Sequence, residues 1–278
     1  MKRILLAISL LLAVTGVHGA VQYEFRQTFH SDVDTMPSND MTGRAVIDGD
    51  RYRVEFLSGS AFPAGSYVIS TNAARQQFWV DPSKKSYVEV NAAGVASALG
   101  SRHITIANKK VDVTPMPDHP IVAGLPTDHY RMVMSYEITV PFGQLQLRQA
   151  VTTVIDKWTT MAYAGVAEGF LAGGSIRTGN PDLDELFDAE NTKIKGFPLR
   201  QTLEITTVNA NPRQPGSQIP LKQTHTQTRD LTITLIESKP EVAAALFQVP
   251  AGFHKADPLR DDTQKSPVHV LSMEPAQQ

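Results

Sequence analysis

Apolar and polar residues alternate along most of this chain, which is the pattern of half-buried β-strands. Asp48-Gly49 stands between two alternating runs and predicts a tight β-hairpin. A second hairpin is expected around residues 81–85, where Pro82 favours a turn. Strands are therefore expected at residues 21–26, 43–47, 51–57, 67–70, 76–80, 86–90, 109–114, 127–140, 144–158, 198–208 and 222–235. The proline-rich stretch 115–126 predicts a turn-rich connection or one edge strand.

Four segments interrupt this alternation and predict helical structure. Residues 91–99 are rich in alanine behind the capping residue Asn91, and residues 159–171 have helical composition. Asn180-Pro181 predicts the start of a further helix, because asparagine caps helices and proline suits their first position. Residues 240–245 predict one or two helical turns. The inward face of the helix after Pro181 is expected to consist of Leu183, Leu186 and Phe187.

The first twenty residues have the three-part layout of a secretory signal peptide. A basic head, Met1-Lys2-Arg3, precedes an apolar run from Ile4 to Val14 and a small-residue exit. The apolar run is shorter than the ~20 residues of a membrane-spanning helix. We expect cleavage after Gly19, a single mature domain over residues 20–256 with a helical insertion at about 159–190, and a disordered tail over 257–278. The expected location is therefore periplasmic or secreted.

Composition narrows the function classes. The net charge is −2 and no basic stripe is present, which argues against nucleic-acid binding. The chain has no cysteine, so it contains no lipid-acceptor cysteine, no disulfide and no thiolate metal site. No second apolar run reaches membrane-spanning length, and no stable membrane span is expected in the mature chain. The near-sequential strands with few helices predict an α+β, mostly β fold and no doubly wound sheet.

Five stretches of the chain resemble the LolA-like superfamily of envelope proteins, and in particular its uncharacterised exported members. They are Tyr23-Glu24-Phe25, residues 43–53, residues 123–130, Gly196-Phe197-Pro198-Leu199-Arg200 and residues 247–253. The resemblance implies a strongly curved, incompletely closed antiparallel barrel with helices across its mouth. It also implies that apolar cargo, such as an acyl chain, is held between sheet and lid. The chain is longer than the lipoprotein carriers of this superfamily and carries an extended helical insertion.

Candidate polar chemistry is sparse. Asp118-His119 and Asp128-His129 flank the proline-rich connection, and carboxylates with imidazoles are metal ligands. Neighbouring residues of a strand face opposite sides, however, so 128 and 129 are not expected to serve one metal. His225 lies on a threonine-rich strand with no partner implied by spacing. No Gly-x-Ser-x-Gly motif is present, and we expect neither an enzyme nor a cofactor or metal site.

The helix expected after Pro181 carries several carboxylates, which either bind a cation or form a solvated face near the positive helix end. These carboxylates are Asp182, Asp184, Glu185, Asp188 and Glu190.

The segment 159–171 is the strongest functional candidate, because its methionine and apolar residues suit either a lid over an apolar pocket or ordinary core packing. We therefore expect an exported envelope protein that binds a lipid or other apolar ligand beneath this segment. The alternative is a non-catalytic module that binds another envelope protein or has a structural role. The expected ligand-lining residues are the sheet aromatics and neighbouring apolar side chains Phe25, Tyr52, Phe56, Trp79, Met132, Met134, Trp158, Met161 and Phe170.

Overall fold

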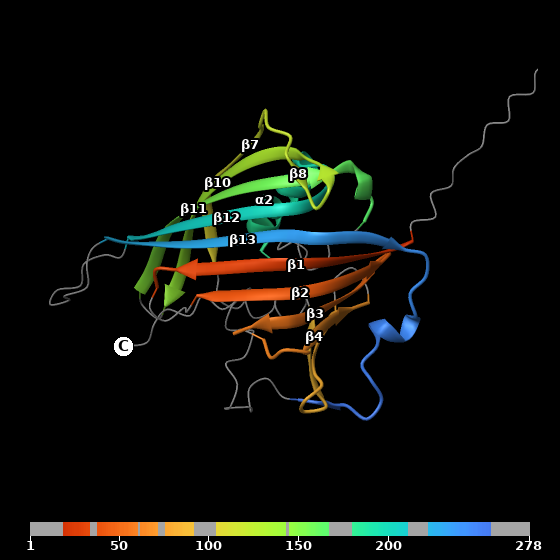
Figure 1. The fold of residues 1–278 in the computed structure, drawn as a ribbon. Helices are drawn as coiled ribbons and strands as arrows, with labels where there is room; N and C mark the ends of the chain where they lie inside the picture. Colours follow the sequence, from red (N-terminus) through yellow and green to blue (C-terminus); the bar gives the residue numbers. More distant parts are fainter. Residues whose placement is uncertain are drawn as a thin grey trace, which may run out of the picture.

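The computed structural model describes residues 19–33, 38–60, 62–71, 76–91, 104–142, 145–166, 180–210 and 222–256. Most of them belong to one twelve-stranded sheet (Figure 1), which confirms a mostly β fold. The strands are β1 (Ala20–Ser31), β2 (Asn39–Asp48), β3 (Arg51–Gly59), β4 (Tyr67–Ser70), β5 (Gln76–Asp81), β6 (Ser86–Asn91), β7 (Thr105–Pro115), β10 (Asp128–Phe142), β11 (Leu145–Thr160), β12 (Phe197–Ala210), β13 (Lys222–Lys239) and β14 (His254–Lys255).

The strand order of the sheet is β14-β6-β5-β4-β3-β2-β1-β13-β12-β11-β10-β7. Neighbouring strands are antiparallel, except that β14 runs parallel to β6. The first long strand, β1, pairs along its whole length with β13, so segments from the two ends of the chain lie side by side at the middle of the sheet (Figure 1). The two outermost strands, β14 and β7, do not pair with each other, and the sheet is therefore open.

Both hairpins expected from the sequence are present. Strands β2 and β3 are joined at Asp48-Gly49, where Gly49 has a φ of 62°. Such a positive φ is readily adopted by glycine, which has no Cβ to clash with the backbone. Strands β5 and β6 are joined by the turn after Asp81. The proline-rich connection forms a small separate hairpin, β8 (Ile121–Val122) and β9 (Leu125–Pro126).

The sheet has two faces because side chains alternate along each strand. One face, which we call the α2 face, carries the largest buried apolar cluster. This cluster spans six strands and includes Phe25 of β1, Tyr52 and Phe56 of β3, Phe197 and Leu199 of β12. These side chains are almost fully buried.

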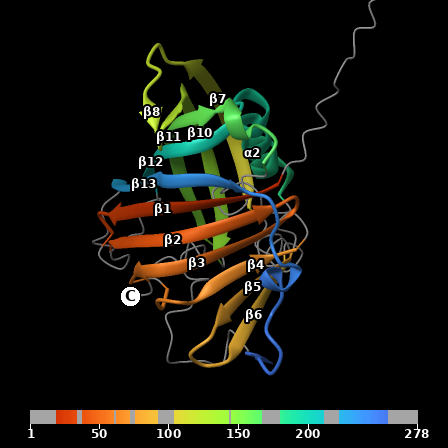
Figure 2. The ribbon, with the colours of Figure 1, turned by 45° about the vertical axis from the view of Figure 1, so that its right-hand side comes forward.

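The opposite face is covered along β2 to β5 by the segment after β13. There, Val46, Tyr67 and Ile69 pack with Phe247, which belongs to the short 3-10 helix η3 (Ala244–Phe247). Figure 2 shows this segment running along β4, β5 and β6. The expected helical turns at 240–245 are therefore found slightly later and as a 3-10 helix. The closing segment leads into β14, which pairs with β6.

The described residues contain one α-helix, α2 (Pro181–Lys193), with the predicted start. The side chain of Asn180 accepts hydrogen bonds from the backbone of Asp182 and Leu183, and proline occupies the first turn. Leu186 is buried and Leu183 partly buried against the sheet, as predicted for both, and the side chain of Phe187 lies outside the described part of the structure. The helix lies beside the part of the sheet that contains β7, β10 and β11 (Figure 2).

The expected helix over 159–171 begins differently. Thr159 and Thr160 still belong to β11, since both pair with β12, and only Met161–Tyr163 form a helix, the 3-10 helix η1. Asn91, the expected cap of a helix at 91–99, is the last residue of β6. Residues 92–99 and 167–179, the expected signal peptide up to residue 18 and the expected tail from 257 lie outside the described residues. Among the described residues, no helix combines the length and the apolar character needed to span a bilayer.

Candidate functional site

The α2 face offers an apolar floor with an irregular cover. The floor consists of the buried cluster around Phe25, Phe56 and Phe197. The cover is formed by side chains that are only partly buried and that come from short segments between the strands. They are Phe62, Val122, Ala123, Leu125, Tyr163 and Val166.

Aromatic rings make several of the contacts between floor and cover. Phe56 of the floor stacks on Phe62, with ring centroids 4.1 Å apart and an interplanar angle of 14°. Phe62 also lies against Trp79 of β5, at 5.1 Å. At the other end, Tyr163 of η1 meets Phe197 edge to face at 6.3 Å. Stacked and edge-to-face arrangements are both favourable for aromatic pairs.

The apolar surface continues under α2. Met132 of β10 and Ile155 of β11 pack against Ile194, which follows the last turn of the helix. Met134 packs with Leu186 of the helix itself. The α2 face therefore carries apolar residues from β3 at one side to β7 at the other.

The structure places seven of the nine predicted lining residues on this face or beside it, and one on the other face. Phe25, Tyr52, Phe56, Met132 and Met134 are buried on the α2 face, and Trp79 packs against the cluster of Phe25, Tyr52 and Phe56. Met161 lies in η1 but is 62% exposed. Trp158 lies on the opposite face, since its neighbour Lys157 points to α2. Phe170 lies outside the described residues.

Polar groups at the edge of the floor differ in how well they are satisfied. The hydroxyl of Tyr52 accepts a hydrogen bond of 2.9 Å from the side chain of Gln77, and burial raises the pKa of Tyr52. The indole Nε1 of Trp79 is buried and has no hydrogen-bond partner within the described residues. A buried donor without a partner costs about 1–3 kcal/mol.

A cluster of polar side chains, which are partly or fully buried, interrupts the apolar surface near the end of α2. The ammonium of Lys157, on β11, lies 2.6 Å from Oε1 of Glu190, in the last turns of the helix. The side chain of Lys157 is 2% exposed and that of Glu190 15%. Arg229 of β13 lies on the same face and interacts electrostatically with Glu190. The acidic helix face expected from the sequence is therefore not uniformly solvated.

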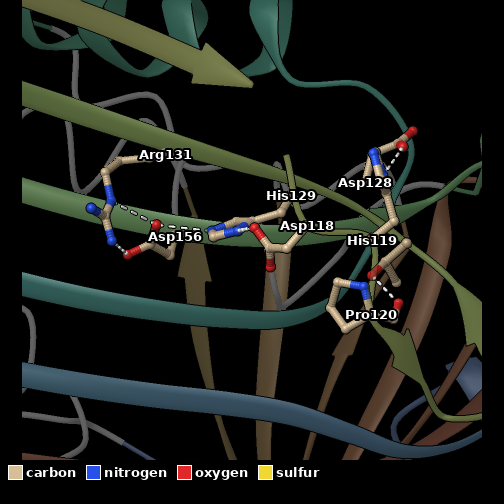
Figure 3. A network of polar contacts seen from close by, with 8 residues as sticks. Asp118, His119, Pro120, Asp128, His129, Arg131 and Asp156 are labelled. Carbon is tan, nitrogen blue, oxygen red and sulfur yellow. Dashed lines mark hydrogen bonds and ion pairs between the residues drawn. The ribbon is translucent and has the colours of Figure 1, made fainter. Parts of the chain in front are cut away.

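The polar network of Figure 3 lies on the opposite face, where β10 and β11 begin and end. Its central residue is His129, which is 7% exposed. Nδ1 of His129 lies 2.6 Å from Oδ1 of Asp118, and Nε2 lies 2.9 Å from Oδ1 of Asp156. Arg131 donates two hydrogen bonds of 2.9 Å to Asp156. The ring of His129 stacks on Trp158 at 4.3 Å.

Hydrogen bonds in this network lower the pKa values of two of its carboxyl groups. The hydrogen bond with His129 holds the pKa of Asp118 below its usual value. Burial acts to raise the pKa of Asp156, but the hydrogen bonds from Arg131 and His129 outweigh it and the pKa is lowered. Both carboxylates are therefore ionised at neutral pH. The network connects the strand pair β10–β11 to the connection that carries the β8–β9 hairpin, whose Val122 and Leu125 cover the floor.

The four residues of the two Asp-His pairs do meet, but as two separate contacts. Asp118 pairs with His129, and Nδ1 of His119 lies 3.1 Å from Asp128, on the exposed side (Figure 3). The alternation of a strand thus separates 128 from 129, as expected. In the described part of the chain, no three His, Asp or Glu side chains are arranged to bind a metal ion.

The remaining candidate polar residues from the sequence take part in ion pairs. His225 has a partner that its spacing did not indicate: Nδ1 lies 3.6 Å from Oδ1 of Asp32. Lys109 of β7 donates hydrogen bonds to Asp182, at 2.7 Å, and to Glu185. These bonds fasten the first turn of α2 to the edge strand. No sequence pattern marked Lys109, Lys157 or Arg229, because each meets its partner only through the strand order.

Comparison with known proteins gives only distant similarity, to solved structures. No family model and no curated protein matches the chain. Among solved structures, a LolA superfamily protein from Nitrosomonas europaea is similar over 84% of this chain and 91% of its own, with a TM-score of 0.28 and 8% sequence identity. The resemblance stated from the sequence is to the same superfamily. A similarity this distant assigns neither a ligand nor a role to the chain.

Proposed function

We propose that this protein binds a lipid or another ligand with an apolar chain on the α2 face, between the aromatic floor and its cover. The observation that carries the proposal is the floor itself. Buried rings of Phe25, Phe56 and Phe197 have side chains of short segments, among them Phe62, Leu125 and Tyr163, packed against their cluster. Each ligand methylene buried on such a surface contributes ~0.8 kcal/mol, so an alkyl chain is bound without any charged contact.

The cover is built so that it opens at low cost. The β8–β9 hairpin has two residue pairs, Ile121↔Pro126 and Val122↔Leu125, and η1 has three residues. Short segments with partly buried side chains open locally more easily than a central strand. Opening replaces the contacts of Leu125 and Tyr163 with those of a ligand. The buried Nε1 of Trp79 is a donor for an ester or carboxyl oxygen at the edge of the floor.

The same proposal includes the compartment. The basic head, apolar run and small-residue exit of residues 1–19 are those of an exported protein, and lipid binding in the periplasm or outside the cell is consistent with them. The curved, incomplete barrel expected from the family resemblance is the shape that such a ligand requires. An envelope protein that receives or delivers the ligand is the expected partner.

Two measurements test the proposal. Lipid extracted from natively purified protein is identified by mass spectrometry, and binding of the uncharged fluorescent probe N-phenyl-1-naphthylamine is titrated. We expect co-purified lipid in the first and saturable binding in the second. Absence of both contradicts ligand binding and favours the alternative of a protein-interaction module.

A matched pair of variants in the β8–β9 hairpin tests the cover. Leu125→Ala removes a side chain that packs on the floor, and Ile121→Ala removes one that is 74% exposed. Probe entry is expected to be faster in the first variant and unchanged in the second. Equal entry rates in both variants contradict a role of this hairpin as a cover.

A further inference from the structure

Arg229 is a partly buried cation of β13. It lies on the α2 face of β13, because Leu231 and Ile233, two and four residues later, belong to the apolar floor. Its Nε is buried and has no hydrogen-bond partner within the described residues. Burial lowers the pKa of Arg229, while the charge of Glu190 raises it. Arginine stays protonated in proteins, so this site holds a positive charge that is poorly compensated.

Arg229 and its polar neighbours lie between two apolar surfaces of the α2 face. In the register of the sheet, Arg229 lies opposite Leu203, and Lys157 lies opposite Gln201, which in turn lies opposite Leu231. Leu203 belongs to the apolar cluster under α2, whereas Leu231 belongs to the floor. Gln201 and Gln27 are buried on the same face. The polar group therefore lies between two apolar surfaces.

The charges of Lys157, Arg229 and Glu190, taken by themselves, do not cancel. Lys157 and Arg229 contribute two positive charges, and Glu190 contributes one negative charge, which is already engaged with Lys157 at 2.6 Å. A buried charge that is not paired is strongly unfavourable, and a negative ligand group that pairs with it is stabilised correspondingly. Guanidinium groups present several N–H donors to carboxylate and phosphate oxygens.

We propose that Arg229, with Lys157 and Glu190 beside it, forms the binding site for the acidic head group of an amphipathic ligand. The head group is a carboxylate or a phosphate, and the attached alkyl chain lies on the aromatic floor. The proposal rests on the function proposed above and narrows its ligand class from apolar molecules in general to anionic amphiphiles. The glutamines Gln27 and Gln201 supply further polar contacts to the same head group.

The test compares ligands that share one chain and differ in the head group. Dodecanoate, dodecyl phosphate and dodecanol each displace N-phenyl-1-naphthylamine at pH 8, below their aggregation concentrations. The two anionic ligands are expected to bind about tenfold more tightly than dodecanol, the effect of one hydrogen bond to a charged group. Acetate and inorganic phosphate, which lack the chain, are expected not to displace the probe. Displacement by these small ions at the same concentrations contradicts an amphiphile site.

Variants at Arg229 assign the preference to this side chain. Arg229→Met keeps the apolar part of the side chain and removes the charge, and it is expected to abolish the preference for anionic ligands over dodecanol. Arg229→Lys is expected to retain most of the preference. Arg26→Met is the matched control, because Arg26 is exposed on the opposite face of β1. Thermal unfolding of each variant shows whether it is folded.

Three outcomes separate the two proposals. If dodecanol binds as tightly as dodecanoate, the head-group site is refuted and apolar binding stands. If the preference survives in Arg229→Met, the assignment to Arg229 is refuted. If neither the probe nor any ligand binds the unaltered protein, the proposed function itself is refuted together with the head-group site.

Discussion

Lys157 and Glu190 form a nearly buried ion pair, 2.6 Å long, that joins a central strand of the sheet to the last turns of α2. The pair joins the helix to β11 near Ile194, which packs with Met132 and Ile155, and its carboxylate interacts electrostatically with Arg229. It connects the packing of the helix with the charge of the proposed head-group site. Its contribution to stability can be separated from that of an ordinary surface pair.

Glu190→Ala is expected to lower the free energy of unfolding by about 3 kcal/mol, because it leaves the ammonium of Lys157 buried without its carboxylate. Urea unfolding measures this. The double variant Lys157→Met with Glu190→Leu is expected to lose much less, since both charges are then absent. Lys110→Ala is the control: its pair with Asp112 is exposed, and a change below about 1 kcal/mol is expected. Equal losses in Glu190→Ala and Lys110→Ala contradict the buried character of the first pair.

Phe56→Ala tests the floor of the α2 face. Phe56 is 1% exposed and stacks on Phe62, so truncation is expected to cost about 3–5 kcal/mol. The next residue, Leu57, faces the other side of the same strand and is 42% exposed. Leu57→Ala is expected to change the free energy of unfolding by less than about 1 kcal/mol. Similar losses in the two variants contradict the assignment of faces in β3.

Gly43→Ala tests the close packing of β1, β2 and β3. A Cβ at residue 43 lies 2.5 Å from the ring of Phe25 and 2.8 Å from the carbonyl oxygen of Glu55. Such overpacking is expected to cost about 1–3 kcal/mol. Combining the variant with Phe25→Leu is expected to recover part of that loss, so the two changes are not additive. Strict additivity in urea unfolding contradicts a contact between residues 25 and 43.

The network around His129 predicts acid sensitivity. The pKa values of Asp118 and Asp156 are lowered in the folded protein from a usual value of 3.8. Their contribution to stability is therefore complete above that value and is lost as the pH falls through the lower, folded-state pKa values. The free energy of unfolding is expected to decline below about pH 4.

Two variants of this network provide the comparison. Asp156→Asn is expected to lower stability at pH 7 and to flatten the decline in acid, because the ionised acceptor of Arg131 and His129 is gone. Asp128→Asn, in the exposed pair with His119, is expected to leave the pH profile nearly unchanged. A profile that Asp156→Asn does not alter contradicts the role of the network in acid sensitivity.

Local features of the fold could be predicted from the sequence, because their causes are local. The Asp48-Gly49 turn and the Asn180 cap depend on a few adjacent residues, and both are present. The prediction for the end of β11 was wrong. Thr159 and Thr160 were expected to begin a helix, but they pair with β12. Pairing with a distant strand outweighed local preference there.

The candidate site could be predicted only in part. The buried aromatics of β1 and β3 follow from alternation, and the structure places them together. In β11, the side chains of Trp158 and Asp156 point to one face of the sheet and that of Lys157 to the other. Alternation alone does not say which of these faces α2 covers. The group of Lys157, Glu190 and Arg229 comes from three distant segments, and only the strand order brings it together.

The chain has two tryptophans, and the structure places them on opposite faces. Trp79 packs against the floor of the α2 face, whereas Trp158 stacks on His129. Quenching by a bromine-labelled fatty acid requires contact between bromine and indole, so the two single-tryptophan variants Trp158→Phe and Trp79→Phe report on one face each.

Fluorescence quenching of these two variants by the brominated fatty acid tests ligand binding on the α2 face most directly. The account predicts strong, saturable quenching of Trp79 and little quenching of Trp158. Quenching of Trp158 alone, or no saturable quenching of either tryptophan, contradicts a ligand site on the α2 face.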